Sequence, residues 1–261
     1  MATDFLSIAL VQSNPYWEDR IANLAYHEEL LSTIEQSVDF IVLPEMFTTG
    51  SSMNASLLAE PMKLHTFRWM YQQAQKFNAS IIGSYIVTEQ GQFYNRLVIV
   101  NPFGEINYYD KKHLFPISFE NEHFTAGEER LIYSKDGWNV CPLICYDLRF
   151  PVWSRNTKLN YEVLIYIANW PSKRDEQWET LLKARAIENQ AYCIGINRVG
   201  KDGNEIDYCG NSLLINFDGT ILTRLTSKEE VSIISLSKNQ LTEYRTKFPV
   251  WKSADSFQLH K

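Results

Sequence analysis

The stretch NVCPLICYDLRFPVW, residues 139–153, decides how this chain folds. Its first half, NVCPLICY (139–146), is an almost continuous apolar run, which is typical of a β-strand that is covered on both faces. Polar residues follow at once, and Pro151 is well placed near the start of a helix, because proline is tolerated in a first helical turn. The stretch predicts a buried strand that ends at Cys145 and turns toward a helix.

Outward from this stretch, similar apolar runs recur along the chain. Seven of them are bounded by turn residues: LSIALVQ (6–12), VDFIVLP (38–44), SIIGSYIV (80–87), RLVIVNP (96–102), VLIYIANWP (163–171), YCIGINRV (192–199) and SLLINF (212–217). Helical spacing lies between some of these runs: Phe67, Met70, Tyr71 and Ala74 form one stripe, and Ile21, Leu24, Leu31, Ile34 and Val38 form a looser one. Strands that alternate with helices predict an α/β fold with helices outside the sheets.

Two further features of the pattern predict two packed sheets. The turns NPFG (101–104) and NFDGT (216–220) join successive strands, which indicates antiparallel hairpins mixed with βαβ units. About a dozen strands are more than one open twisted sheet usually holds. Because the sequence has no linker, low-complexity tract or repeat, residues 1–261 are expected to form a single domain.

The composition indicates an ordinary soluble globular protein, with 45% hydrophobic and 21% charged residues. The net charge of −6 argues against partners that are nucleic acids or anionic membrane surfaces. The N-terminus MATDFLSIALVQSNP has no basic n-region, and no apolar run is long enough to span a membrane. Four cysteines are too sparse for a disulfide scaffold, so we expect a cytoplasmic protein with reduced thiols.

Cys145 lies where the buried strand gives way to polar residues. A nucleophile at a strand-to-helix turn is exposed, and nearby backbone N–H groups offer a site for an oxyanion. The alternative is a buried structural thiol, since free cysteine is among the most buried residue types. Cys141 lies four residues earlier, on the same strand face by period-2 counting. No metal is expected, because His113 and His123 stand alone and no Cys/His cluster has ligand spacing.

Glu45, in VDFIVLPEMFTTG (38–50), comes directly after a predicted buried strand. This position is the carboxyl edge of a sheet, where ligand crevices of open α/β folds occur. The alternative is a solvated glutamate at the end of a strand. Taken alone, Glu45 favours the interpretation as a solvated strand-end residue.

The segment INYYDKKHLFPISFENEHFTAGEE (106–129) is dense in polar groups interleaved with aromatic residues. We expect a long loop after a strand, and such loops are often functional. Nothing local separates Lys111 from Lys112, or Glu120 from Glu122.

A predicted helix in WETLLKARAIENQAYCIG (178–195) carries Arg185, with Glu188 three residues on. The spacing lets the two side chains pair. We interpret them as a half-buried ion pair that holds the helix against the sheet, in preference to a direct catalytic role.

Four segments, LPEMF (43–47), DKKHLF (110–115), CYDLRFP (145–151) and ARAIENQ (184–190), together resemble the carbon–nitrogen hydrolase family, often called the nitrilase superfamily. The resemblance covers essentially the whole chain and is closest to the omega-amidase branch. It implies the family's four-layer αββα sandwich of two mixed β-sheets flanked by helices, which agrees with the two predicted sheets. It also implies subunits that pair through outer helices into a homodimer or a higher homo-oligomer.

The resemblance selects among the candidate residues. The family motif has its lysine two residues before the histidine of a His-Leu-Phe segment, which selects Lys111. Its second glutamate precedes an aromatic-Thr-x-Gly element, which selects Glu120; the family commonly has proline where this chain has Ala126. Glu45, Lys111 and Cys145 would then form a catalytic triad, with Glu120 as a fourth member.

The implied activity is that of a cysteine-dependent amidohydrolase. It would release ammonia from the terminal amide of short 2-oxo dicarboxylic acid monoamides (2-oxoglutaramate, 2-oxosuccinamate) through a thioester acyl-enzyme, without a cofactor. Lys111 and the backbone N–H of Tyr146 would stabilise the oxyanion. The alternatives are an N-carbamoyl amidohydrolase or a nitrilase with the same triad, or an inactive scaffold of the same fold.

An omega-amide acid carries an α-carboxylate, so its pocket should offer a cation. Arg149 is the candidate, and an arginine that ties the turn after the strand to the sheet is the alternative. Four other residues are expected to line the pocket: Phe47, Phe115, Asn169 and Trp170.

Overall fold

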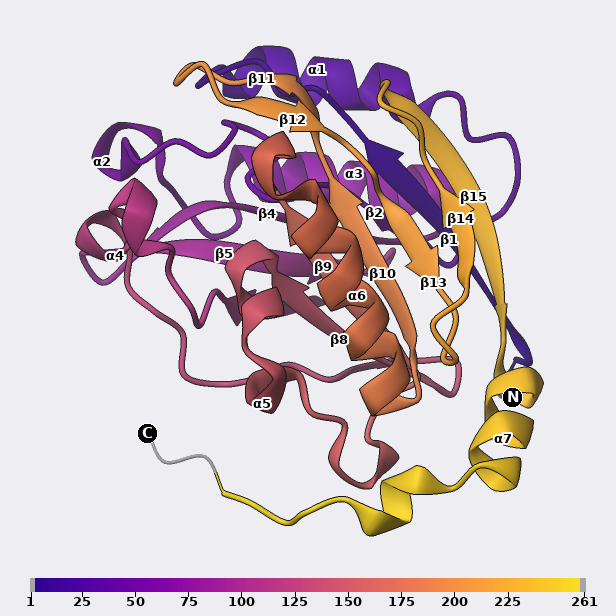
Figure 1. The fold of residues 1–261 in the computed structure, drawn as a ribbon. Coiled ribbons are helices and arrows are strands. Elements are labelled where there is room, and N and C mark those ends of the chain that lie inside the picture. The colour runs from indigo at the N-terminus through magenta and orange to yellow at the C-terminus, as the bar shows by residue number, and fades with distance from the viewer. Residues whose placement is uncertain (1–2, 259–261) are drawn as a thin grey trace.

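The computed structural model describes residues 3–258. Two large β-sheets lie face to face, and helices cover the outer side of each, which gives four layers (Figure 1). The predicted αββα sandwich of two mixed sheets is confirmed. Among residues 3–258 no helix is long and apolar enough to cross a membrane.

The first sheet has the strand order β15-β1-β2-β4-β5-β6, with β3 paired to β4. Strands β1, β2 and β4 are parallel, and β15, β5 and β6 join them in antiparallel pairs. The strands are β1 (Phe5–Gln12), β2 (Phe40–Val42), β3 (Glu60–Pro61), β4 (Ser80–Glu89), β5 (Gln92–Val100), β6 (Ile106–Asp110) and β15 (Glu230–Ser237). The predicted hairpin at 101–104 joins β5 to β6, with Gly104 at a φ of +81°.

The second sheet has the order β14-β13-β10-β9-β8-β7, in which β8, β9 and β10 are parallel. The predicted hairpin at 216–220 joins β13 to β14. The strands are β7 (Tyr133–Lys135), β8 (Trp138–Ile144), β9 (Val163–Ala168), β10 (Tyr192–Asn197), β13 (Leu213–Ile215) and β14 (Ile221–Arg224), and β11 (Val199–Lys201) and β12 (Asp207–Cys209) form a separate small sheet.

Helices α1 and α3 cover the first sheet, and α6 covers the second. The helix predicted from Phe67 to Ala74 is α3, whereas α1 ends at Leu31, before Ile34 and Val38 of the predicted stripe. The α-helices are α1 (Arg20–Leu31), α2 (Ala55–Leu58), α3 (His65–Phe77), α4 (Glu120–His123), α5 (Pro151–Ser154), α6 (Asp175–Asn189) and α7 (Lys238–Lys247). The 3-10 helices are η1 (Pro116–Ser118), η2 (Cys145–Arg149), η3 (Thr157–Leu159), η4 (Ser172–Arg174) and η5 (Val250–Ser253).

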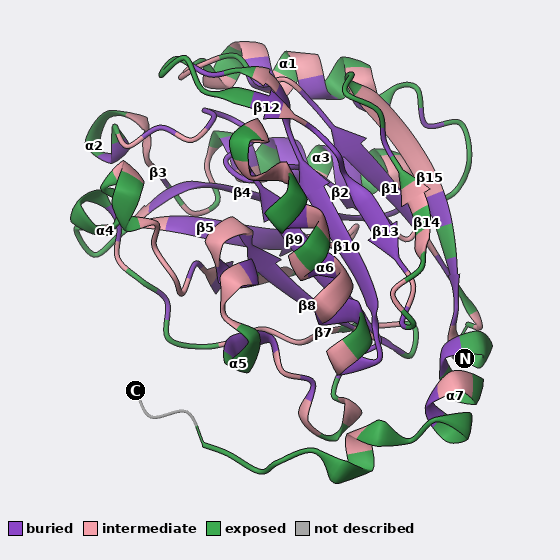
Figure 2. Ribbon diagram, in the orientation of Figure 1, coloured by how far each residue is buried: buried purple, intermediate pink, exposed green. Residues whose placement is uncertain are grey.

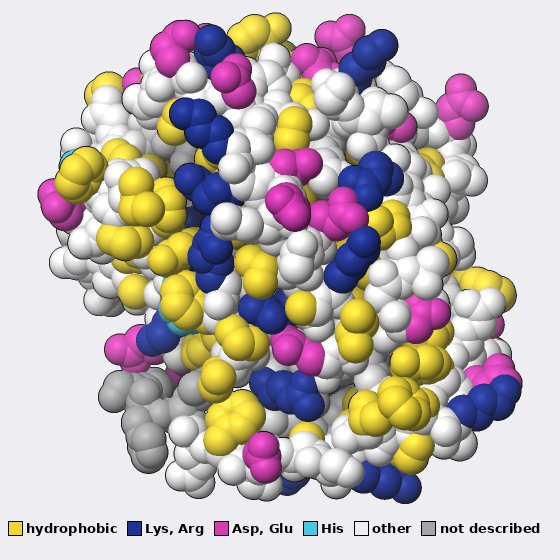
Figure 3. All heavy atoms as spheres, viewed as in Figure 1, with side chains coloured by type: hydrophobic (Ala, Val, Ile, Leu, Met, Phe, Trp, Pro, Cys, Tyr) yellow, Lys and Arg dark blue, Asp and Glu magenta, His cyan; other side chains and the backbone are white. Residues whose placement is uncertain are grey.

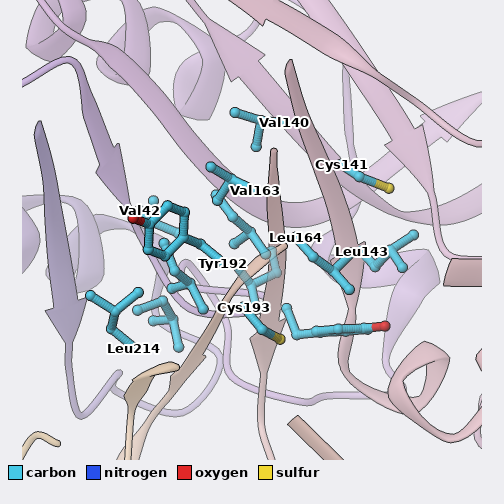
Figure 4. Close-up of a cluster of buried hydrophobic side chains, with 14 of the residues drawn as sticks. Val42, Val140, Cys141, Leu143, Val163, Leu164, Tyr192, Cys193 and Leu214 are labelled. Atoms are coloured by element: carbon cyan, nitrogen blue, oxygen red, sulfur yellow. The ribbon is translucent and has the colours of Figure 1, made fainter. Parts of the chain in front are cut away.

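The main hydrophobic core lies between the sheets. Leu6, Ile8 and Leu10 of β1 face the second sheet, while Ala9 and Val11 face α1 and α3, as the period-2 geometry of a strand requires. Both sheets are buried along most of their length, and the helices expose only their outer sides (Figure 2). Cys141 and Cys193 are buried on the other face of the second sheet, which α6 covers (Figure 4). Both lie opposite Leu164 of β9, and Gly195, two residues after Cys193, faces Trp178 and Leu182 of α6.

Several chain segments that carry polar candidates meet at one edge of the sandwich. Glu45 follows the parallel strand β2, and Lys111 follows β6, which runs in the same direction because both β4 and β6 are antiparallel to β5. Cys145 and Asn169 follow the neighbouring parallel strands β8 and β9. The backbone N–H of Asn169 donates to the Glu45 carboxylate at 2.8 Å, so the edges of the two sheets meet at this point.

Candidate active site

Cys145 is the first residue after β8, and its backbone has a φ of +43°. A non-glycine residue in this left-handed region marks a sharp turn, and such strain gathers at functional sites. Cys145 is half-buried, with its sulfur 3.9 Å from the Asn169 carbonyl oxygen. The fully buried structural thiol of this segment is Cys141, on the strand itself.

Asp147 holds this turn together, and sequence reasoning missed it. It is fully buried, and its Oδ2 accepts hydrogen bonds from the Tyr109 hydroxyl at 2.7 Å and the Ile144 N–H at 3.1 Å. Its Oδ1 accepts from the backbone N–H of His113 at 3.0 Å and from the His113 Nδ1 at 2.7 Å. An acid directly after a buried strand and two residues past the cysteine was the available signal.

Glu45 is 2% exposed, so the solvated strand-end glutamate of the alternative interpretation is wrong. Its Oε1 accepts from the Lys111 Nζ at 2.8 Å and the Asn95 Nδ2 at 2.9 Å. Its Oε2 accepts from the Asn169 N–H at 2.8 Å. Asn95 was not predicted; it lies beside Arg96 in the first half of β5, before the apolar run 97–100, where the sequence gives no specific sign of it.

Lys111 is buried between two carboxylates. Its Nζ lies 2.8 Å from Glu45 Oε1, and 3.0 and 2.9 Å from the two oxygens of Glu120. Lys112 instead lies over the Trp153 ring, and Glu122 is exposed. The structure thus brings Lys111 and Glu120 together with Glu45, and leaves both competitors outside this cluster.

The electrostatics of the cluster follow from burial and from the single lysine. Burial raises the pKa of the Cys145 thiol well above its ordinary value, and the Glu45 charge raises it further while Lys111 opposes. Burial would also raise the pKa of Glu45, but Lys111 and the amide donors hold that pKa below its ordinary value. Burial raises the pKa of Glu120, and the two carboxylates raise that of Lys111 against the effect of burial. The resting site therefore holds a neutral thiol beside an ionised carboxylate.

The cluster lies in a cavity of about 840 Å³. Of the predicted pocket residues, Phe115, Asn169, Trp170, Tyr146 and Arg149 line this cavity. Phe47 does not: its ring is fully buried, 5.3 Å from that of His27 and 5.7 Å from that of Trp69. Residues 45–49 form a turn in which Met46 has a φ of +47°, so side chains two apart do not share a face there.

Basic side chains mark one wall of the cavity. Arg149 donates to the Gln177 side chain at 2.6 Å, and its guanidinium lies 4.8 Å from the centre of the Trp170 ring. Arg174, which sequence reasoning missed, lies 5.4 Å from the centre of the Phe115 ring. A row of Lys and Arg side chains runs down this face beside the hydrophobic side chains over α2 and α4 (Figure 3).

The predicted pair of Arg185 and Glu188 is present, with a distance of 3.1 Å between Nη1 and Oε1. Arg185 also donates to the Leu148 carbonyl at 2.5 Å. It therefore holds α6 against η2, as the interpretation of a structural pair requires, and it does not line the cavity.

A cysteine at a strand-to-helix turn, beside a buried acid–lysine–acid cluster, is an arrangement suited to acyl transfer through a thiol. Among residues 3–258 no group of three or more His, Cys, Asp or Glu side chains is placed to hold a metal ion. Comparison with known proteins agrees with this class: the family model for carbon–nitrogen hydrolases matches residues 7–246, and the chain belongs to that family.

Two curated relatives and one solved structure illustrate the similarity. Omega-amidase YafV of Escherichia coli is 46% identical over 257 residues, which cover 97% of this chain and 98% of the relative. A 2-oxoglutaramate amidase of Bacillus subtilis is 33% identical over 233 residues, or 88% and 90% of the two chains. A CN-hydrolase superfamily protein of Xanthomonas campestris, solved with an arsenic adduct in its active site, has a TM-score of 0.97 at 39% identity and covers 99% of this chain and 100% of its own. The chain is an amide-hydrolysing enzyme.

Proposed function

We propose that the enzyme releases ammonia from the terminal amide of short 2-oxo dicarboxylic acid monoamides, with Cys145 as nucleophile. The observation that carries the proposal is the cluster of Cys145, Glu45, Lys111 and Glu120 inside a cavity with a basic wall. The similarity to an omega-amidase and to a 2-oxoglutaramate amidase supports the choice of substrate.

In the first half of the reaction, Cys145 sulfur attacks the amide carbon while Glu45 takes the thiol proton. The high pKa of the thiol makes this transfer part of the attack and not a separate earlier step. Lys111 has three N–H donors; one faces Glu45 and one lies between the oxygens of Glu120, so one is left for the oxyanion. The N–H of Tyr146, in the first turn of η2 and without an acceptor in that helix, is the second donor.

Collapse of the tetrahedral intermediate breaks the carbon–nitrogen bond. Glu45 returns its proton to the nitrogen, ammonia leaves, and a thioester on Cys145 remains. Water then attacks the thioester as Glu45 takes a proton from it, and the second collapse restores the thiol and releases the carboxylic acid. Asn95 and Asn169 hold Glu45 in place through both halves of the cycle.

A substrate panel tests this function. Purified enzyme should release ammonia from 2-oxoglutaramate and 2-oxosuccinamate at much higher kcat/KM than from N-carbamoyl amino acids or nitriles. Cys145→Ala should lower that rate at least about 1000-fold, because the nucleophile is lost. The matched control Cys209→Ala, a half-buried thiol on β12, should keep wild-type rates. If neither 2-oxo acid amide yields ammonia, the substrate assignment is wrong; preference for a carbamoyl compound or a nitrile would name the alternative.

The proposal also includes a homodimer or higher homo-oligomer in the cytoplasm. Val152 on α5 and Ile187 on α6 are each 50% exposed on the outer helices, which suits a contact between subunits. All four cysteines are unpaired, as in a reducing compartment.

A further inference from the structure

The cavity holds two arginines that could meet a substrate carboxylate, and their surroundings differ. Arg149 is already engaged: its Nη2 donates to Gln177 of α6 at 2.6 Å, and its guanidinium lies 4.8 Å from the centre of the Trp170 ring. These contacts tie the turn after Cys145 to α6. Arg149 therefore positions the turn after Cys145, which we call the elbow; the alternative interpretation also gave it this role, but with the sheet in place of α6 as the partner.

The guanidinium of Arg174, in contrast, has no polar partner among the described residues. Within residues 3–258 its guanidinium makes no hydrogen bond or ion pair, and its contact is with the face of the Phe115 ring. Its backbone is fixed, because its N–H donates to Pro171 and its carbonyl accepts from the Trp170 indole at 2.9 Å. Arg174 is thus prepared to bind a carboxylate in bidentate fashion. Its backbone is fixed, the Phe115 ring aligns the plane of its guanidinium, and all the N–H donors of that guanidinium are unpaired within the described part of the chain.

The position of Arg174 links it to the residues around the nucleophile. Phe115, on which it lies, follows Lys111 in the same loop and donates its N–H to Glu120 at 2.7 Å. The Phe115 ring is 5.0 Å from that of Tyr146, the residue after Cys145. Arg174 and Tyr146 therefore contact the same ring, and both line the cavity that holds Cys145.

Acidic residues also line the cavity and limit where an anion can lie. Asp202, Glu205 and Asp207 belong to β12 and to the segment before it, and they repel a carboxylate. The guanidinium of Arg174 is thus a favourable place for the acid end of the substrate when its amide faces Cys145.

We propose that Arg174 binds the α-carboxylate of the substrate and selects acidic amides over neutral ones, while Arg149 positions the elbow. This inference rests on the proposed function, since it names what that substrate meets. It predicts an effect on substrate binding that depends on the charge of the substrate and leaves the chemical step intact.

The test compares Arg174→Gln with Arg149→Gln on two kinds of substrate. With 2-oxoglutaramate, Arg174→Gln should raise KM about 30-fold or more with kcat within about twofold, the loss of one charged hydrogen-bonded pair. With pentanamide, an amide of the same chain length without a carboxylate, the kcat/KM of this variant should equal that of the wild type. Arg149→Gln should instead lower kcat on both substrates by similar factors. Arg68→Gln, on the exposed side of α3, is the matched control for loss of one positive charge.

A binding measurement separates this inference from the proposed function. Calorimetry with 2-oxoglutarate and the Cys145→Ala variant should give a Kd that Arg174→Gln weakens about 30-fold and Arg68→Gln leaves unchanged. If omega-amides are not hydrolysed but this Arg174-dependent binding is present, the proposed function fails and the anion site stands. A KM and a Kd that are unchanged in Arg174→Gln, or that shift only in Arg149→Gln, would overturn the inference.

Discussion

The backbone of Cys145, at a φ of +43°, has a conformation that costs a non-glycine residue roughly 1–2 kcal/mol. The surrounding structure must supply that free energy. Asp147 does so from two residues away: it takes the N–H of Ile144, directly before Cys145, and anchors it to Tyr109 and His113. The direction in which the thiol points thus depends on a carboxylate that never enters the cavity.

Asp147→Asn tests this positioning role. All four groups around the carboxylate donate hydrogen bonds, so the new amide N–H₂ must face donors and leave at least one of them unpaired. We expect the free energy of unfolding in urea to fall by about 3 kcal/mol. In the folded variant kcat should fall at least about tenfold, because the nucleophile shifts relative to Glu45.

The matched control is Asp39→Asn, a carboxylate at the opposite end of β2 from Glu45 that accepts the Ser7 N–H at 2.8 Å. It should lose some stability and keep its kcat. A folded Asp147→Asn enzyme with wild-type kcat would show that the elbow holds its geometry without the carboxylate.

At the scale of elements, the loop after β6 must bring Lys111 to Glu45 with little freedom, and Gly127 makes this possible. The N–H of Gly127 donates to the Lys111 carbonyl at 2.9 Å, so the end of the loop lies directly against its beginning. A Cβ at position 127 would lie 2.1 Å from the Asp110 carbonyl oxygen. No side chain fits there unless one of the two segments moves.

Gly127→Ala should therefore displace Lys111. We expect overpacking to cost about 1–3 kcal/mol in urea unfolding, and a shift of Lys111 by a fraction of an ångström to lower kcat by about 10- to 100-fold. Ala126→Ser, one residue earlier and exposed, should leave both quantities unchanged. Normal kcat in Gly127→Ala would mean that the loop yields without moving the lysine.

The strands were predictable from the sequence because a strand that is buried on both faces consists of a continuous apolar run, as in β8, β9 and β10. The residues of the site were predictable only in part. Lys111 and Lys112 differ in the direction in which each side chain points, and the local sequence does not indicate that direction. Asn95, Asp147 and Arg174 act through partners far along the chain, and Phe47 was misplaced because the segment after Glu45 is a turn and not a strand.

At the scale of the whole molecule, the layers are joined by buried polar contacts as well as by the apolar core. Asn169 of the second sheet donates both its backbone N–H and its Nδ2 to Glu45 of the first, each at 2.8 Å. On the other side of the first sheet, His27 of α1 is fully buried. Its Nδ1–H donates to the Asn23 carbonyl at 2.7 Å, and its Nε2 lies 3.0 Å from the Ser13 hydroxyl.

This histidine makes the stability of the whole fold depend on pH. Burial lowers the pKa of His27 from 6.5 to about 4, against the opposing effect of its bond to Asn23. Between these two values the unfolded chain takes up a proton at this residue and the folded chain does not. The unfolded state then binds more protons, so stability is full above pH 6.5 and falls as the pH drops toward 4, by about 1.4 kcal/mol per unit.

Urea unfolding at pH 7 and pH 5 measures this loss. Between pH 7 and pH 5 the free energy of unfolding of the wild type should fall by about 2 kcal/mol more than that of His27→Gln, because the part of this interval below pH 6.5 contributes. Any packing that the variant loses lowers its stability equally at both pH values. The comparison uses the difference between the two pH values within each protein, so the buried carboxylates near Lys111 affect both proteins alike. His123→Gln, an exposed histidine of α4, should keep the wild-type dependence. Equal pH dependence in the wild type and His27→Gln would mean that the folded state admits the proton, and that α1 opens at Ser13 and Asn23 more readily than its contacts indicate.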